Sequence, residues 1–248
     1  MLSERKWRLD TVPYLLFGVF SSMLVGGSLA QALEMNSNPQ GQLFIFLLNT
    51  IFFQAMALVF IVVFLHYNKL RWKEAFGFEN GDVRKWLPLS AGTFLLVLPA
   101  VWVLGWLSAR LIEMAGDKPQ LQFTVQVLQT KPPLGETLLM AGVTIFLAPV
   151  VEELLFRGII YPTVKQLGYP KTAFFGTAFL FAIFHLNLMT LFPLFVLALV
   201  LTWLYEITDN LLAPIVVHAL FNAANCITLL WQTELGEFFN KLLKLLPV

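Results

Sequence analysis

Long apolar runs constrain the fold of this chain more than any other feature of its sequence. Only 12% of the residues are charged and 58% are hydrophobic, whereas soluble domains carry roughly 25% charged residues. A helix of about 20 apolar residues is long enough to cross a bilayer. Runs of this kind predict membrane spans at residues 12–33, 43–65, 87–109, 137–157 and 211–231. The sequence therefore predicts an all-α fold, a polytopic bundle of transmembrane helices.

A further run, residues 172–205, carries no formal charge and is too long for one span. As a single helix it would measure about 50 Å, against a hydrocarbon core of about 30 Å. Asn187 and Pro193 predict a break within it, so two rather short helices are expected. The total is then seven spans, with an eighth left open. The helix that begins near residue 137 is expected to continue to about Lys165.

Lysine and arginine predict the orientation, because cytoplasmic loops carry an excess of both. The N-terminal tail and the loop 66–86 together hold eight of the sixteen such residues. Both are therefore predicted to be cytoplasmic, which places the segment 110–136 outside. Within that segment, polar and apolar residues alternate over Gln120–Val127, and this favours an extended or interfacial piece over a span.

The organisation of the chain follows from these runs. We expect membrane helices and loops over residues 1–136, a helical core over 137–231 and a tail over 232–248. The tail has apolar residues at helical spacing, which predicts an amphipathic helix lying on the membrane. A formal net charge of +1 gives no case for nucleic acid as a partner, and the single cysteine, Cys226, excludes an intrachain disulfide and a zinc ribbon.

Two adjacent acids and an arginine stand inside the apolar segment that follows residue 137. A charge at membrane depth costs roughly 2.5–3.5 kcal/mol and usually faces a bundle interior or a wet cavity. On a helix, Glu153 and Arg157 share a face at the spacing of an ion pair, whereas Glu152 is rotated by about 100°. We therefore predict a structural acid, Glu153, bound to Arg157, and a free acid, Glu152, directed into a cavity. The alternative is that both acids only hold helices together.

Three more polar side chains stand in the apolar C-terminal half, namely His185, His218 and Asn222. An acid, two imidazoles and an amide from three helices can hydrolyse a peptide bond. A carboxylate with a neighbouring imidazole can hold and deprotonate a water, and N–H groups can stabilise the oxyanion that forms. The sequence contains no G-x-S-x-G, no H-E-x-x-H and no paired aspartates within its spans. Other routes to proteolysis within the membrane are therefore not indicated.

These residues resemble, in order and approximate spacing, the three signatures of the CAAX protease and bacteriocin-processing (CPBP, or Abi) family, which includes the Ras-converting CAAX endopeptidases. The signatures read Glu152-Glu153-x-x-x-Arg157-Gly158, Phe181-x-x-x-His185 and His218-x-x-x-Asn222. The resemblance covers about residues 137–226 and implies an intramembrane endopeptidase whose site opens toward the cytoplasm. Its expected partners are membrane lipid and a membrane-associated peptide or protein, lipidated in the CAAX case. Members of prokaryotic type are linked to bacteriocin or signal-peptide processing, so a bacterial plasma membrane is expected; the cytoplasmic N-terminus is the prediction from lysine and arginine given above.

The resemblance also implies a role for each matched residue. Glu152 would be the base that activates water, and His185 would hold that water. His218 and Asn222 would form the oxyanion hole, while Glu153 and Arg157 would support the site.

Two rival functions remain open on the sequence. A non-catalytic membrane protein that binds a peptide, such as an immunity protein, would keep the helix packing and tolerate loss of Glu152. A small transporter could use Glu152 and the histidines as a proton relay, but the inverted hydropathy repeats typical of transporters are not found in the sequence.

The metal requirement is the least determined point. Glu152, His185 and His218 are three residues of the types that hold catalytic zinc. Zinc-bound histidines are usually fixed by a second carboxylate or carbonyl, and the only other nearby acid, Glu153, is assigned to Arg157. The sequence therefore favours a mechanism with no cofactor, with zinc as the alternative.

Overall fold

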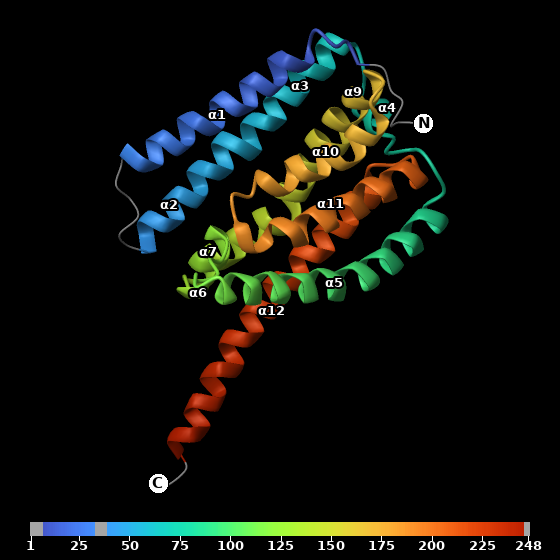
Figure 1. Ribbon diagram of the computed structural model, residues 1–248. Coiled ribbons are helices and arrows are strands. Elements are labelled where there is room, and N and C mark those ends of the chain that lie inside the picture. Colours follow the sequence, from blue (N-terminus) through green and yellow to red (C-terminus); the bar gives the residue numbers. More distant parts are fainter. Residues whose placement is uncertain (1–6, 33–38, 246–248) are drawn as a thin grey trace.

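The computed structural model describes the backbone of residues 7–32 and 39–245, and the side chains of residues 7–32 and 41–231 (Figure 1). Helices make up the structure, and no strand occurs within these ranges. In chain order the helical segments, of which η3, η4 and η5 are π-helical, are α1 Val12–Ala32, α2 Pro39–Asn49, η3 Thr50–Ala55, α3 Met56–Asn68, α4 Trp72–Phe76, α5 Val83–Met114, α6 Phe123–Gln129, α7 Leu134–Gly142, η4 Val143–Leu147, α8 Ala148–Glu153, η5 Leu154–Ile160, α9 Tyr161–Gln166, α10 Pro170–Ile183, α11 Leu188–Thr208 and α12 Leu212–Leu245. The predicted all-α class is confirmed for the described residues.

Several of these segments join end to end, so that six stretches are long and apolar enough to cross a membrane. They are Val12–Ala32, Gly41–Asn68, Val83–Met114, Leu134–Gln166, Leu188–Thr208 and Leu212–Trp231. The spans predicted at residues 12–33, 43–65, 87–109, 137–157 and 211–231 each fall on one of these stretches. The predicted continuation of the fourth helix to about Lys165 is confirmed. The chain is an integral membrane protein.

The prediction of seven or eight spans is wrong for the part of the chain that the structure describes, because the run 172–205 gives one full span instead of two short ones. The break lies where Asn187 predicted it: its side-chain oxygen accepts a hydrogen bond from the Thr190 amide at 3.0 Å and so caps α11. Pro193 lies inside α11, where it removes one hydrogen bond near the helix start without ending the helix. Helix α10 has 14 residues, about 21 Å, which is too short to cross.

Two further expectations need correction. The segment Gln120–Val127, predicted to be extended or interfacial and not a span, is no span but is helical from Phe123 onward, because α6 covers Phe123–Gln129. The predicted tail helix is not separate from the last span, because α12 continues without a break to Leu245 and extends well beyond the bundle (Figure 1). Residues 246–248 of that tail lie outside the described residues, and its placement on the membrane stays a prediction.

The core is centred on the π-helical turn η5. All seven of its residues, Leu154–Ile160, are buried, and α4, α10 and α11 surround it (Figure 1). Gly158 allows the close approach of α4, since a Cβ atom at this position would lie 2.6 Å from a ring atom of the buried Phe76. Charged residues of η5 and α8 are therefore held in the middle of the bundle, away from lipid.

Candidate active site

Glu153 and Arg157 form the buried ion pair that the sequence predicts. Arg157 Nη1 donates to Glu153 Oε1 at 2.9 Å, and both side chains are almost completely buried. The guanidinium also donates from Nη2 to the Ala198 carbonyl at 3.0 Å and from Nε to the Thr202 hydroxyl at 3.4 Å. Its Cζ lies 4.6 Å from the centre of the Phe181 ring. The buried charge is thus compensated by an anion and several acceptors, as burial of an arginine requires.

His218 lies between the two acids, a contact that the sequence did not reveal. Its Nδ1 is 2.9 Å from Glu153 Oε1, the same oxygen that accepts from Arg157. Its Nε2 is 3.8 Å from Glu152 Oε2. Because a carboxylate paired with an arginine can only accept, the proton on Nδ1 belongs to the imidazole. The Nε2 atom is therefore the one that faces Glu152.

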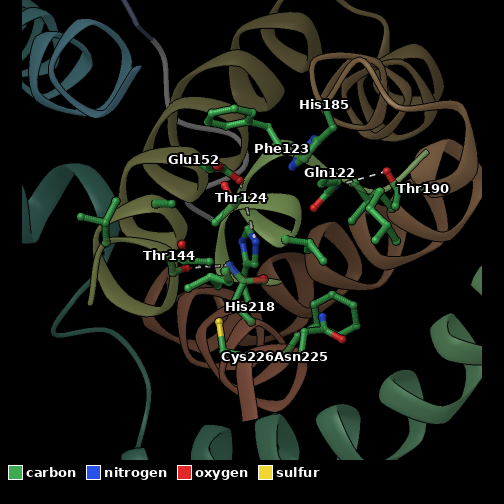
Figure 2. A pocket seen from close by; sticks show the side chains of 18 of the residues that line it. Gln122, Phe123, Thr124, Thr144, Glu152, His185, Thr190, His218, Asn225 and Cys226 are labelled. Carbon is green, nitrogen blue, oxygen red and sulfur yellow. Dashed lines mark hydrogen bonds and ion pairs between the residues drawn. The ribbon is translucent and has the colours of Figure 1, made fainter. Parts of the chain in front are cut away.

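Glu152 is the acid that reaches the cavity, as predicted. Its side chain is 13% exposed, whereas that of Glu153 is 0% exposed. The cavity measures about 760 Å³ and is lined by Glu152, His185, His218 and Asn222. Figure 2 shows Glu152, His185 and His218 directed into it from different helical segments. The predicted set of four side chains therefore shares one space.

His185 reaches the cavity from the turn between α10 and α11. Its Nδ1 lies 2.8 Å from the Phe181 carbonyl oxygen. A carbonyl can only accept, so Nδ1 carries a proton and donates it. In the neutral ring, Nε2 is then a hydrogen-bond acceptor directed away from this contact. Asparagine capping at Asn187 fixes the turn and hence the position of the imidazole.

Asn222 is held by the π-helical turn η4. Its Nδ2 donates to the Thr144 carbonyl oxygen at 2.8 Å (Figure 2). A π-helical turn changes the hydrogen-bond partners of nearby backbone carbonyls and is frequent at functional sites. One of the two amide N–H groups of Asn222 is thus occupied, and the second is available to a ligand.

Other polar side chains line the cavity and were not predicted, among them Gln54, Gln122, Thr190 and Asn225. Gln122 donates to the Thr190 hydroxyl at 3.2 Å and joins the α6 segment to α11 (Figure 2). Trp102 donates from its indole nitrogen to Asn225 Oδ1 at 2.8 Å. Two of these residues could have been noticed in the sequence: Gln54 stands inside the apolar run 43–65, and Asn225 follows Asn222 by one helical turn.

The cavity extends from the middle of the bundle toward the end at which α6 lies. Its lining comes from the second half of α5, from α6, from the first turns of α11 and from the second half of the last span. The basic loop before α5 lies at the opposite end, next to α4 (Figure 1). With the basic loop in the cytoplasm, the α6 end of the cavity would lie outside, so the orientation of the protein and the side on which the site opens stay predictions.

The residues do not fit a three-ligand metal centre as they stand. Among the side chains described, no group of three or more His, Cys, Asp or Glu residues lies close enough together to hold a metal ion. The sequence assigns Glu153 to Arg157 alone, which leaves no carboxylate to fix a zinc-bound histidine. That assignment is wrong, because Glu153 Oε1 binds His218 as well as Arg157. Both histidines have Nδ1 on an acceptor, as metal-bound histidines usually do. We derive no step through a metal.

Comparison with known proteins gives a match to one family model and to one curated protein. Residues 134–224 match the family model described as Type II CAAX prenyl endopeptidase Rce1-like. The resemblance carried by the three motifs is thus confirmed as a similarity over residues 134–224. The UPF0177 protein YxdF of Lactococcus lactis subsp. lactis (strain IL1403) is 32% identical over 77 residues, which make up 31% of this chain and 42% of that protein. The match thus spans less than half the length of that curated relative, and no solved structure matches.

Proposed function

We propose that this protein is an intramembrane endopeptidase that hydrolyses a peptide bond of a membrane-associated peptide or protein. The observation that carries the proposal is the division between the two acids. Glu153 is fully buried and accepts from Arg157 and His218, whereas Glu152 faces the cavity next to His218. A carboxylate that faces a cavity while the neighbouring acid holds the buried arginine is suited to accept a proton.

Glu152 and His185 would hold the attacking water. His185 donates from Nδ1 to Phe181, so its Nε2 can accept one water hydrogen while Glu152 accepts the other. Both hydrogens are then directed away from the substrate, and an oxygen lone pair faces the carbonyl carbon. As the C–O bond forms, Glu152 takes one water proton. Catalytic hydrogen bonds are often longer in a free enzyme and tighten with substrate.

His218 and Asn222 would stabilise the oxyanion. An imidazole that donates from Nδ1 to Glu153 can also donate from Nε2 only when it carries both protons, so this role requires the imidazolium form of His218. Asn222 contributes the N–H group that Thr144 does not use. Collapse of the intermediate breaks the C–N bond, and the departing amine takes the proton that Glu152 received.

The substrate class follows from the lining and from the family. The cavity lining combines a majority of apolar side chains with many polar ones, which suits a peptide that lies at the membrane and needs partners for its backbone. The matching family model describes CAAX prenyl endopeptidases, so a prenylated peptide that ends in a CAAX sequence is a suitable first probe. Bacteriocin or signal-peptide processing belongs to the same reaction class.

Replacement of Glu152 by glutamine tests the proposal. Glu152→Gln should lower cleavage by roughly 10²–10⁴-fold, the usual contribution of general acid–base catalysis, while the protein still folds and inserts. Glu136→Gln is the matched control, because this acid lies on the same long helical stretch and does not line the cavity. Membrane peptides that stay uncut in Glu152→Gln cells, but not in control cells, would identify the substrate by proteomics. Unchanged cleavage by Glu152→Gln would refute the proposal and favour non-catalytic peptide binding.

A further inference from the structure

Gln54 is a buried amide with no partner, and it lines the same cavity as the catalytic candidates. Its residue is 8% exposed, and its Oε1 is buried without a hydrogen bond. A buried acceptor that stays unsatisfied is destabilising, and most such groups in native proteins are paired. It lies in η3, far in sequence from residues 134–224, which match the endopeptidase family. The site therefore contains a polar group that neither the fold nor the proposed catalysis uses.

The segment that carries Gln54 is held rigidly. The Ser22 hydroxyl of α1 donates to the Phe52 carbonyl oxygen of the π-helical turn at 2.6 Å. Gly26 allows the same close approach, because a Cβ atom there would lie 2.6 Å from Phe52 Cβ. A π-helical turn widens the helix locally and turns the following side chains. Gln54 is therefore kept in the cavity wall by a built contact between α1 and η3.

The chemistry of a primary amide defines what Gln54 can bind. Its oxygen accepts and its nitrogen donates, which is complementary to the N–H and C=O groups of one peptide unit. The remaining wall near η3 is largely apolar, with Met23, Phe46 and Phe53 among the lining residues. A peptide backbone that enters such a wall loses water and needs partners for its polar groups. The Gln54 amide can supply them once its terminal group turns toward the peptide, because its Oε1 is buried in the free protein.

We propose that Gln54 is a substrate-binding residue, which pairs with a backbone peptide unit of the substrate on the wall formed by α1 and η3. This inference rests on the proposed endopeptidase function. It adds a recognition element from the N-terminal half of the chain to a catalytic set that comes from the C-terminal half. The contact acts on binding and is made equally in the ground state and in the transition state.

The test compares Gln54→Leu with Gln42→Leu. Gln42 also has a buried Oε1 without a partner, but it does not line the cavity. The probe is a farnesylated peptide that ends in a CAAX sequence and carries a fluorophore and a quencher, cleaved by the purified full-length protein in micelles. Gln54→Leu should raise KM by about 3–10-fold with kcat nearly unchanged, the loss expected for one hydrogen bond in uniform binding. Gln42→Leu should leave both constants unchanged.

Two further measurements separate binding from structure. The melting temperature of Gln54→Leu should equal or exceed that of the parent, because the substitution removes an unsatisfied polar atom. A series of probe peptides, each N-methylated at one backbone position, provides the second measurement. At one position, methylation should raise the KM of the parent protein and leave the KM of Gln54→Leu unchanged.

Each remaining outcome is decisive. If the parent protein cleaves the probe and Gln54→Leu has the same KM, the inference is refuted and the proposed function is unaffected. A lowered melting temperature with unchanged KM assigns Gln54 to the fold. If the parent protein neither binds nor cleaves the probe, the result contradicts the proposed function and therefore also this inference.

Discussion

Removing the charge of Glu153 should destabilise the protein strongly, because this carboxylate compensates a buried guanidinium. Its Oε1 accepts from Arg157 and from His218, each at 2.9 Å. The other oxygen, Oε2, is buried and has no hydrogen-bond partner. A glutamine that keeps its oxygen on Arg157 would thus place its NH₂ group where nothing accepts. Breaking one partner of a buried ion pair typically costs about 3–5 kcal/mol, and we expect Glu153→Gln to fall in this range.

The assay is reversible unfolding of the purified protein in mixed micelles, followed by the loss of helical signal. Glu113→Gln is the control, since Glu113 pairs with Arg110 on the surface at 2.9 Å, and exposed pairs of this kind contribute about 0–1 kcal/mol. The double variant Glu153→Gln with Arg157→Met removes the uncompensated charge. It should be about 2 kcal/mol more stable than Glu153→Gln alone, as replacement of whole buried pairs is often nearly neutral.

Two results would refute this reasoning. One is a Glu153→Gln protein as stable as the Glu113→Gln control, which would mean that Arg157 does not depend on this acid. The other is a double variant that is less stable than the single one, since the cost would then come from lost packing. Activity offers a second readout: the double variant should recover stability without recovering full cleavage, because the Nδ1 proton of His218 then faces a neutral amide instead of a carboxylate.

The remaining predictions concern catalysis, metal, packing and topology. His218→Ala and Asn222→Ala should each lower turnover by roughly 10²–10³-fold with little change in binding, as for one oxyanion donor; a large loss of binding at constant turnover would make them substrate anchors instead. Elemental analysis should find well under one equivalent of zinc, and activity should survive a strong chelator, whereas activity restored only by added zinc would establish a metalloprotease. Gly158→Ala should cost about 1–3 kcal/mol in the same unfolding assay, as overpacking does, because the added Cβ would lie 2.6 Å from a buried ring atom; a neutral effect would show that α4 can move. With the single cysteine replaced by serine, Lys85→Cys should label only from the cytoplasm and Lys118→Cys only from outside, and the reverse pattern would place the cavity on the cytoplasmic side.

The sequence by itself determined those features that depend on the period and composition of one segment. Apolar runs located the membrane helices, because hydrocarbon excludes charge over about 20 residues. The four-residue spacing of Glu153 and Arg157 predicted their ion pair, since residues at this spacing are neighbours on any helix. Asn187 predicted the break before α11 through its own capping hydrogen bond. The three motifs predicted the family of the domain at residues 134–224.

Only the tertiary structure decided which side chains meet across helices. His218 contacts both acids although it is 65 residues from Glu153, and hydropathy carries no information about such a partner. Asn222 reaches a carbonyl of η4, and Gln54 reaches the cavity, because two helices depart locally from regular α-helical hydrogen bonding. The same reason explains why Glu153 was wrongly assigned to Arg157 alone: a sequence pairs Glu153 with its nearest neighbour on the helix, whereas a carboxylate oxygen in a packed bundle accepts from every donor within reach. Pairing in a low-dielectric interior is decided by three-dimensional packing, since each buried polar group binds what the neighbouring helices bring to it.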